Sequence, residues 1–258
     1  MLEITISQRD LEEFFLILVR IASFISITPF FGQSNVPMRF KLGFAVFFSY
    51  IIYMIIPEQA LDYDTTLGYA TLVIKEAIVG FLVGFSAFIC STIVLFAGRI
   101  VDMDIGFAMA NLYDPTTREQ VSLTGVFYQR IYFILSIISG AHLFLIGAMA
   151  DTYTLIPIGG VSFNILLYGT FVGFLSDYFI IGFRIILPIF AVTLISNCVM
   201  GIMTKIAPQI HMFSVGIQFK ILAGLLILFM TVVLMPNIAD FLGEEMRKMV
   251  IDVIRGLT

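Results

Sequence analysis

Four charged side chains stand inside or at the edges of apolar stretches of this sequence, where they could relay protons or bind a substrate. They are Arg20, Glu76, Arg184 and Lys220. A charge at mid-bilayer costs about 2.5–3.5 kcal/mol even on the lenient insertion scale, so such groups normally face protein or water. The sequence therefore allows two interpretations: an intramembrane relay, or buried contacts between helices.

Two of these charges have glycines spaced from them at intervals of four residues, which places all members of each set on one helix face. The sets are Glu76 with Gly80 and Gly84, and Lys220 with Gly216 and Gly224. Small residues at this interval let a second helix approach closely. The spacing therefore favours crowded protein interfaces, and we expect Arg20, which is surrounded by apolar residues, to face other helices as well.

Motifs for catalysis are missing from the sequence. The only histidines are His142 and His211, neither of them in an HExxH pattern, and the turn around Ser86 is only loosely similar to that of a serine protease. Cys90 and Cys198 form no CxxC pair and are expected to be small buried side chains. We predict a protein that is not an enzyme and uses no cofactor or metal.

The composition is that of a membrane protein. Hydrophobic residues make up 60% of the 258 residues and charged residues 12%, against about 25% charged in soluble domains. The net charge of −4 argues against binding to nucleic acid. The prediction is an all-α, polytopic integral membrane protein.

The elements that must position these residues are hydrophobic helices. Crossing a bilayer takes about 20 apolar residues, and we predict about six helices, with a seventh segment at 156–175 left open. The apolar runs are 14–31, 42–56, 77–98, 131–150, 185–204 and 221–235. Residues 1–236 are predicted to form one helical domain, and the apolar spacing in 237–258 predicts an amphipathic C-terminal helix.

Residues 102–120 interrupt this apolar pattern. They combine charged residues and a proline with a short soft centre around Phe107 and Met109, preceded by Gly106. This segment is too polar to span a membrane and unusually apolar for a linker.

The order of several short features along the whole chain resembles the FliR family of bacterial flagellar export-gate proteins. These features are Arg20, Pro29, Val36-Pro37 with Arg39 and Lys41, Glu76 with Gly80 and Gly84, Ala97-Gly98, Asp102, Gly106, Asp114-Pro115, Gly201, Pro208-Gln209, Phe213 and Gly216. The chain departs from the family pattern at Lys205, His211 and Gln218.

The resemblance implies a subunit of the type III export gate in the flagellar basal body of the bacterial inner membrane. It implies partners of the FliP and FliQ types, an FlhB-type switch protein, unfolded flagellar substrates and membrane lipid. Helical hairpins of the subunits would assemble into a helical pore complex through which the substrates pass.

Two groups of site residues follow from the resemblance and from the glycine spacing. The expected pore plug, for which a surface loop is the alternative, is Gly106, Phe107, Ala108, Met109, Ala110, Asn111 and Leu112. The expected subunit interface contains Arg20, Glu76, Gly80, Gly84, Pro208, Gln209, Gly216 and Lys220.

Two other functions remain open at this point. A secondary transporter or small-ion channel would use Glu76, Arg184 and Lys220 as its relay, although no inverted repeat of interrupted helices supports it. A homologue from a virulence-type injectisome would look similar to a flagellar one.

Overall fold

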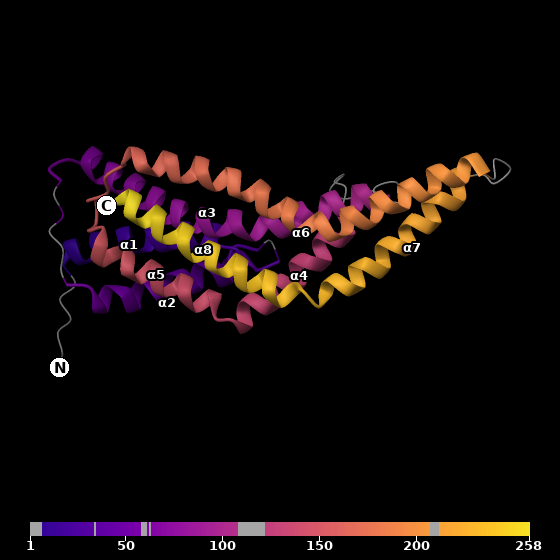
Figure 1. Ribbon diagram of the computed structural model, residues 1–258. Coiled ribbons are helices and arrows are strands. Elements are labelled where there is room, and N and C mark those ends of the chain that lie inside the picture. The colour runs from indigo at the N-terminus through magenta and orange to yellow at the C-terminus, as the bar shows by residue number, and fades with distance from the viewer. Residues whose placement is uncertain (1–6, 34, 58–60, 62, 108–121, 207–211) are drawn as a thin grey trace. The chain divides into compact units, whose positions relative to one another are not determined.

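Helices account for every regular element in the described part of a computed structural model of the chain, which comprises residues 7–33, 35–57, 61, 63–107, 122–206 and 212–258. Figure 1 shows them, and their bounds are α1 Gln8–Ile27, α2 Met38–Ile55, α3 Thr66–Ile105, α4 Leu123–Ile138, α5 Ala141–Leu155, α6 Ile165–Ile206, α7 Met212–Val232 and α8 Met235–Leu257. The predicted all-α class is confirmed.

The chain packs as two compact units whose boundaries fall inside or between these helices. The first unit contains Met1–Cys90, Gly140–Phe174 and Glu244–Thr258, and the second contains Ser91–Ser139 and Leu175–Gly243. Each unit combines stretches that are far apart in the sequence, whereas the prediction divides the chain once, at residue 236. That domain boundary stays a prediction.

In the first unit, α1, α5 and the C-terminal part of α8 lie alongside one another (Figure 1). α1 begins with a capping box, in which the Ser7 side chain accepts from the backbone and the Asp10 carboxylate accepts from the Ser7 N–H at 2.8 Å. Tyr153 of α5 donates to the Ile17 carbonyl of α1, and the Arg247 guanidinium of α8 lies over the Phe144 ring of α5. The fully buried side chains from these three helices include Leu16, Ile17, Ile21, Leu145, Met149, Met246, Val250 and Val253.

The loop before α6 caps the end of α8. The backbone N–H groups of Ser162 and Asn164 donate to the carbonyls of Leu257 and Gly256, each at 3.2 Å. The last carbonyls of a helix have no partner inside the helix, so this loop satisfies groups that would otherwise need water. The Ser162 hydroxyl adds a bond of 2.7 Å to the Thr258 carbonyl.

The second unit is held by close helix contacts and aromatic packing. A Cβ on Gly98 of α3 would lie 2.2 Å from the Gly125 Cα of α4, so the two backbones touch there. On α3, the Phe96 ring packs against the rings of Tyr178, Phe179 and Phe183 of α6. Tyr128 of α4 and Thr231 of α7 share a hydrogen bond of 2.5 Å.

The membrane spans differ in part from the predicted ones. Within the described residues, α2, α3 and α6 are long and apolar enough to cross a membrane, and the total rises to five if α4–α5 and α7–α8 each count as one broken span. The run 131–150, predicted as one helix, breaks at Ser139 and Gly140, where Gly140 has a φ of 75°. That left-handed conformation ends the helix and is accessible to glycine at little cost. α1 is not among the spans because it carries charges at Arg9, Asp10, Glu12, Glu13 and Arg20.

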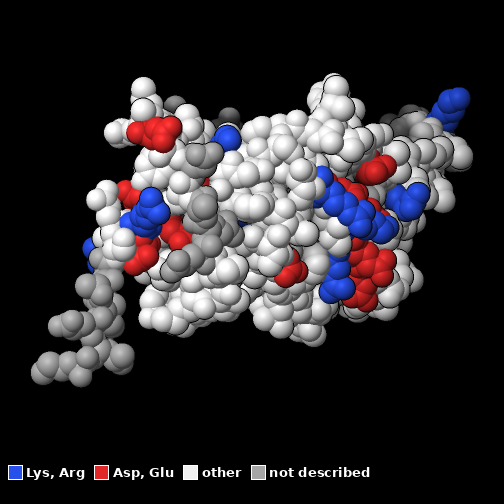
Figure 2. Space-filling model, turned by 90° about the vertical axis from the view of Figure 1, so that its left-hand side faces the viewer, with Lys and Arg blue, Asp and Glu red and all other residues white. Residues whose placement is uncertain are grey.

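The surface is dominated by uncharged side chains. On the face that Figure 2 shows, Lys, Arg, Asp and Glu gather in a few small groups, and most of the other described area is white. Large apolar side chains on α6 and α7 are strongly exposed, among them Phe229 at 80%, Leu222 at 66% and Ile195 at 61%. A soluble monomer does not expose apolar area on this scale, so lipid or other proteins must cover these helices.

Candidate functional site

The first unit contains a buried ion pair between Arg20 of α1 and Glu76 of α3. The Arg20 Nε lies 2.5 Å from Glu76 Oε2, and one terminal nitrogen lies 3.0 Å from Oε1, which makes the pair bidentate. Both residues have zero exposure. An unpaired charge at such a position would cost several kcal/mol, so each residue requires the other.

The surrounding backbone satisfies the remaining polar groups of this pair. The second terminal nitrogen of Arg20 donates to the carbonyl of Ile156 at 3.1 Å and to two oxygens of Thr152 at 3.4 Å. Glu76 Oε1 also accepts the Gly159 N–H at 2.8 Å. The Tyr153 ring lies 4.3 Å from the guanidinium carbon, close enough for a cation–π contact. The pair therefore joins α1, α3, α5 and the loop after α5.

Gly80 and Gly84 bring α1 against α3 beside the ion pair. A Cβ on Gly80 would lie 2.0 Å from the Arg20 carbonyl oxygen, and one on Gly84 would lie 2.4 Å from Ile27 Cγ2 and 2.9 Å from the Phe24 carbonyl oxygen. The backbones can approach this closely only because both positions lack a side chain. Glu76, Gly80 and Gly84 thus act on the same neighbour, α1.

The second unit holds a hydrogen-bonded cluster at the C-terminal end of α3. Asp102, which is 2% exposed, accepts from the Ser122 hydroxyl at 2.7 Å and from the Thr124 N–H at 3.2 Å. Ser122 is the N-cap of α4 and accepts the Gly125 N–H at 2.9 Å. Asp102 therefore ties the end of α3 to the start of α4.

Asp104 extends this cluster to α6 and α7. Its carboxylate accepts from the Thr193 hydroxyl of α6, and its other oxygen lies 4.0 Å from the Lys220 Nζ of α7. The side chains of Lys220 and Asp104 are 20% and 18% exposed, so this pair is more open to solvent than a core pair. Lys220 has a carboxylate partner within the chain itself.

The glycines around Lys220 approach side chains and not a backbone. A Cβ on Gly216 would lie 2.8 Å from Met200 Sδ, and one on Gly224 would lie 2.7 Å from the Ile105 side chain. These contacts are close but deformable, unlike the contact of Gly80 with the Arg20 backbone. The same sequence spacing thus gives two kinds of packing.

The predicted plug is described only at its beginning. Gly106 has a φ of 97°, which ends α3 in a left-handed turn that favours glycine, and Phe107 follows it half-buried. The other plug residues and two of the predicted interface residues lie outside the described residues: Ala108, Met109, Ala110, Asn111, Leu112, Pro208 and Gln209. The plug and the subunit interface both stay predictions.

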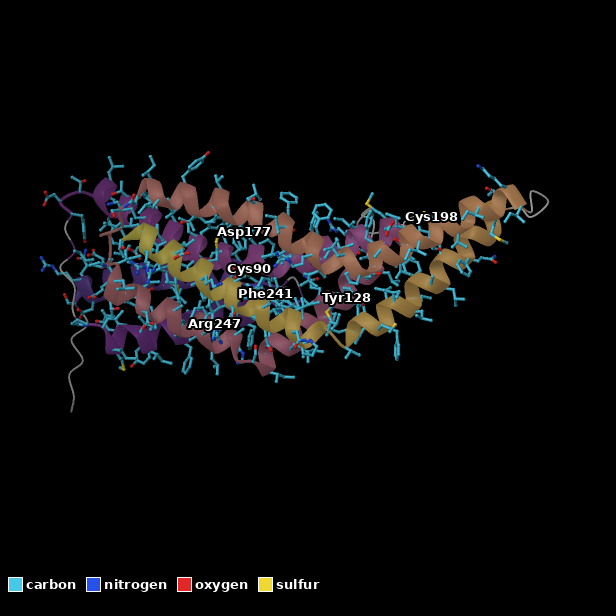
Figure 3. All side chains as sticks on the ribbon, viewed as in Figure 1. Cys90, Tyr128, Asp177, Cys198, Phe241 and Arg247 are labelled. Carbon is cyan, nitrogen blue, oxygen red and sulfur yellow. The ribbon has the colours of Figure 1, made fainter. Side chains whose placement is uncertain are left out.

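Several features of the site could not be found from the sequence. The partners of Arg20 in Thr152 and Ile156 lie more than 130 residues away, and no motif marks them. Ser122 did carry a signal, because a serine before an apolar run is a typical N-cap. Cys90 on α3 is buried as expected, whereas Cys198 on α6 is exposed, so the expectation for Cys198 was wrong. Figure 3 labels both residues. In the described part of the chain, no group of three His, Cys, Asp or Glu side chains could hold a metal ion.

Comparison with known proteins gives a match along almost the whole chain. The sequence model for bacterial export proteins, family 1, matches residues 11–248. The flagellar biosynthetic protein FliR of Bacillus subtilis (strain 168) is 30% identical over 248 residues, which cover 92% of this chain and 93% of that protein. FliR of Escherichia coli (strain K12) is 27% identical over 263 residues, covering 100% and 99% of the two chains. FliR of Buchnera aphidicola from Acyrthosiphon pisum is 24% identical over 235 residues, with 91% of each chain covered.

Proposed function

This chain belongs to the bacterial export proteins, family 1, and from that membership we propose that it is a component of the flagellar type III protein export gate. In this function the chain forms, with partner membrane subunits, the channel through which unfolded flagellar proteins cross the inner membrane. The observation that carries the proposal is the family match over residues 11–248 together with relatives named as flagellar FliR over nearly their full lengths. The chain is assigned no catalytic step.

The proposed partners are FliP-type and FliQ-type membrane subunits and an FlhB-type switch protein, in the basal body of the inner membrane. The exposed helix α6 supports such partners. Its exposed face carries Asp177 and Arg184 among apolar side chains such as Ile195 (Figure 3 labels Asp177). Charges on a lipid-facing helix are costly, so protein or water is the better neighbour for this face.

For the segment Gly106–Leu112 we propose the role of a movable plug in the closed pore. Support comes from the described residues on either side of it, since Asp102 holds Ser122 and Thr124 next to the end of α3. These bonds join α3 to α4 without residues 106–112, so a displacement of those residues would leave this link between the two helices in place. Irregular backbone at membrane depth is tolerated where it is buried in protein or lines a water-filled cavity.

The proposed subunit interface has two parts with different roles. Gly216 and Lys220, with Pro208 and Gln209, belong to the α6–α7 region and are proposed to contact neighbours directly. Arg20, Glu76, Gly80 and Gly84 contact one another inside the chain. Their proposed contribution is to fix the α1–α3 packing on which the outer face of the unit depends.

Co-purification tests the gate assignment. The full-length chain is expected to elute from detergent in one complex with FliP-type and FliQ-type subunits expressed with it, as blue-native gels would show. A stable monomer, or a symmetric homo-oligomer that does not bind those subunits, would contradict the proposal.

Deletion of residues 106–111 tests the plug. The complex is expected to assemble at normal size while cells carrying it take up small solutes that the wild-type complex excludes. A matched variant with Phe107→Ser and Met109→Ser keeps the length and removes the apolar bulk, and it is expected to leak as well. A correctly assembled deletion variant that stays as tight as wild type would assign the segment to the surface.

Neither alternative from the sequence is favoured by an observation. The carboxylate of Glu76 is fully engaged by Arg20 and Gly159 and has no exposure, which does not suit a transport relay with Arg184 and Lys220. The relatives compared above are named as flagellar proteins.

A further inference from the structure

One side of α6 in the second unit is packed and the opposite side is open. The packed side holds three isoleucines that are at most 6% exposed: Ile181, Ile186 and Ile189. On the open side, Ile180, Leu187 and Leu194 recur every seven residues and are 48–58% exposed. Apolar residues at this interval are typical of a helix that packs along a second helix.

Five further exposed residues complete a heptad pattern on this open side. They are Asp177, Arg184, Ala191, Cys198 and Gly201. From Asp177 to Gly201 the members follow one another at alternating intervals of three and four residues, which places them in one stripe along the helix. We call this stripe the α6 seam, and at 1.5 Å per residue it is about 36 Å long.

The second half of the α6 seam permits the close approach of another backbone. Ala191, Cys198 and Gly201 have small side chains, and a Cβ on Gly201 would meet no atom within 4 Å. Small residues on one helix face let a second helix pack closely against it. The shape of this half therefore fits a helix.

The first half of the α6 seam carries two opposite charges. Asp177, which Figure 3 labels, and Arg184 form no salt bridge with any described residue. Pro188 has no N–H, so the Arg184 carbonyl lacks its usual donor in the helix. Contact with lipid is unfavourable for ionised side chains and for an open carbonyl, so a protein surface with complementary polar groups fits better. Lys205, one heptad beyond Cys198, needs no such partner because the helix dipole favours a cation in the last turn.

A second copy of this chain does not satisfy the α6 seam. Parallel pairing of two α6 helices in register would place Asp177 against Asp177 and Arg184 against Arg184, and like charges repel. Antiparallel pairing that brings Asp177 to Arg184 would place Ser196 opposite Ile165, the first residue of the other α6. The small residues after Ser196 would then extend beyond that helix. The seam therefore requires a helix from a different chain.

We propose that the α6 seam binds one long apolar helix of a partner membrane subunit. This helix presents a basic residue to Asp177 and, one heptad further along, an acidic residue to Arg184. Beyond them its backbone packs closely on Ala191, Cys198 and Gly201. The two opposite charges fix the register of the contact and disfavour helices that lack this pair. The inference rests on the proposed function, since it gives one of the proposed partner subunits its contact on this chain.

Cys198 reports whether the α6 seam is covered. The chain has two cysteines, and the other, Cys90, is fully buried, so N-ethylmaleimide modifies Cys198 selectively. The full-length chain is treated alone and in the complex co-purified with FliP-type and FliQ-type subunits, and mass spectrometry of this chain follows the modification. Cys198 is expected to react about tenfold more slowly in the complex, which corresponds to about 1.4 kcal/mol of protection. Equal rates in an assembled complex would overturn the proposal and leave the proposed function standing.

Photo-crosslinking from Cys198 identifies the partner helix. A benzophenone maleimide on this cysteine is expected to label a partner residue that lies about 14 residues, or two heptads, from an acidic residue facing Arg184. A basic residue should follow one heptad further, about 21 residues from the label. Labelling of a second copy of this chain, or of a helix without this pair of charges, would overturn the proposal.

Charge reversal tests the pairing itself. Arg184→Glu is expected to keep the wild-type size-exclusion profile of the chain alone and to lower the yield of the complex on blue-native gels about tenfold, because it opposes like charges. Reversal of the acidic residue on the labelled partner helix to arginine should restore assembly.

The matched control is Arg130→Glu, which reverses an exposed arginine on α4 of the same unit and should assemble normally. Assembly of Arg184→Glu at the wild-type yield would overturn the proposal. Failure of wild type itself to form a complex would instead contradict the proposed function, and this contact with it.

Discussion

Arg20 carries a positive charge at zero exposure, and Glu76 is the only acidic side chain bonded to it in the described residues. The buried pair is stable because the charged groups of both residues have hydrogen-bond partners, so the loss of one partner leaves a buried charge uncompensated. Glu76→Gln leaves the shape unchanged and removes the negative charge. We expect the free energy of unfolding to fall by about 3 kcal/mol, the cost typical of breaking a buried pair.

Thermal melting of the purified chain in detergent measures this loss. The matched control is Glu245→Gln, which breaks the exposed pair with Lys248 at 2.7 Å and should cost less than about 0.5 kcal/mol. A double variant with methionine at both Arg20 and Glu76 is expected to recover much of the lost stability, since apolar replacement of a buried pair is often tolerated. Equal melting of Glu76→Gln and the control would show that the pair has no electrostatic role.

Glu12 offers a pH-dependent contribution outside the spanning helices. The Tyr63 hydroxyl donates to its carboxylate, and this bond, with smaller effects of Gln8 and Arg9, lowers the pKa of Glu12 from its ordinary 4.5. A carboxyl whose pKa is lowered on folding stabilises the folded state above its unfolded pKa, and that contribution is lost as the pH falls through the folded pKa.

Tyr63→Phe should therefore destabilise the protein at neutral pH while keeping the ring contact with Tyr69. The difference from wild type is expected to shrink as the pH falls from 4.5 through the lowered pKa of Glu12. Melting temperatures of both proteins across that pH range provide the measurement. A difference that persists unchanged at the acid end would mean that the hydroxyl acts independently of the ionised Glu12.

At the scale of helices, glycine positions decide how closely α1 and α3 pack. Gly80→Ala places a methyl group 2.0 Å from the Arg20 carbonyl oxygen, so the two backbones must separate. We expect a loss of about 1–3 kcal/mol from overpacking and a weaker ion pair beside it. The same change at Gly147 of α5, where a Cβ meets nothing within 4 Å, should be neutral or stabilising, because alanine favours helix over glycine by about 1 kcal/mol.

Melting of the two alanine variants, compared in the same detergent, gives the result. If both variants melt together with wild type, the close approach of α1 and α3 has no energetic consequence. Both changes replace a helical glycine with alanine, so a difference between their melting temperatures reports the effect of the neighbouring atoms.

The sequence located the middle of α3 and missed its length, because the predicted run 77–98 lies inside a helix of 40 residues, Thr66–Ile105, which includes the start of the segment 102–120. The broken elements were predicted poorly. The spacing of Glu76, Gly80 and Gly84 indicated one crowded face, and all three residues act on α1. The run 131–150 is uniformly apolar and was therefore predicted as one helix, although the helix ends near Gly140 and α5 begins there. Gly140 was the local residue that could have indicated this break. Hydropathy reports which residues avoid water and carries little information on the backbone torsion that ends a helix.

At the scale of the whole molecule, the exposed face of α6 is expected to act in assembly and not in folding. Ile195 is 61% exposed and Ile189 is 1% exposed on the same helix. Ile195→Asp should leave the chain folded and prevent its entry into the complex with partner subunits. Ile189→Asp should instead unfold the chain, because a carboxylate is buried there without a partner.

Size-exclusion profiles of the chain alone and blue-native gels of the co-expressed complex separate these two effects. Normal assembly of Ile195→Asp would show that this face meets lipid or water and no subunit. The sequence could not specify such faces, because composition makes all sides of α6 nearly equally apolar and only packing decides which side is covered.

The contribution of residues 244–258 to the first unit has a consequence for synthesis. This segment supplies Met246, Val250 and Val253 to a core whose other parts come from residues before 175, and Ser162 and Asn164 bond to its last turn. Domains made from contiguous chain can fold from the N-terminus while translation proceeds. Here the earliest helices have to wait in the membrane until the second unit has been translated. During that interval the core formed by α1, α3 and α5 is not yet covered by the C-terminal part of α8, and an insertase or chaperone can bind the exposed apolar side chains.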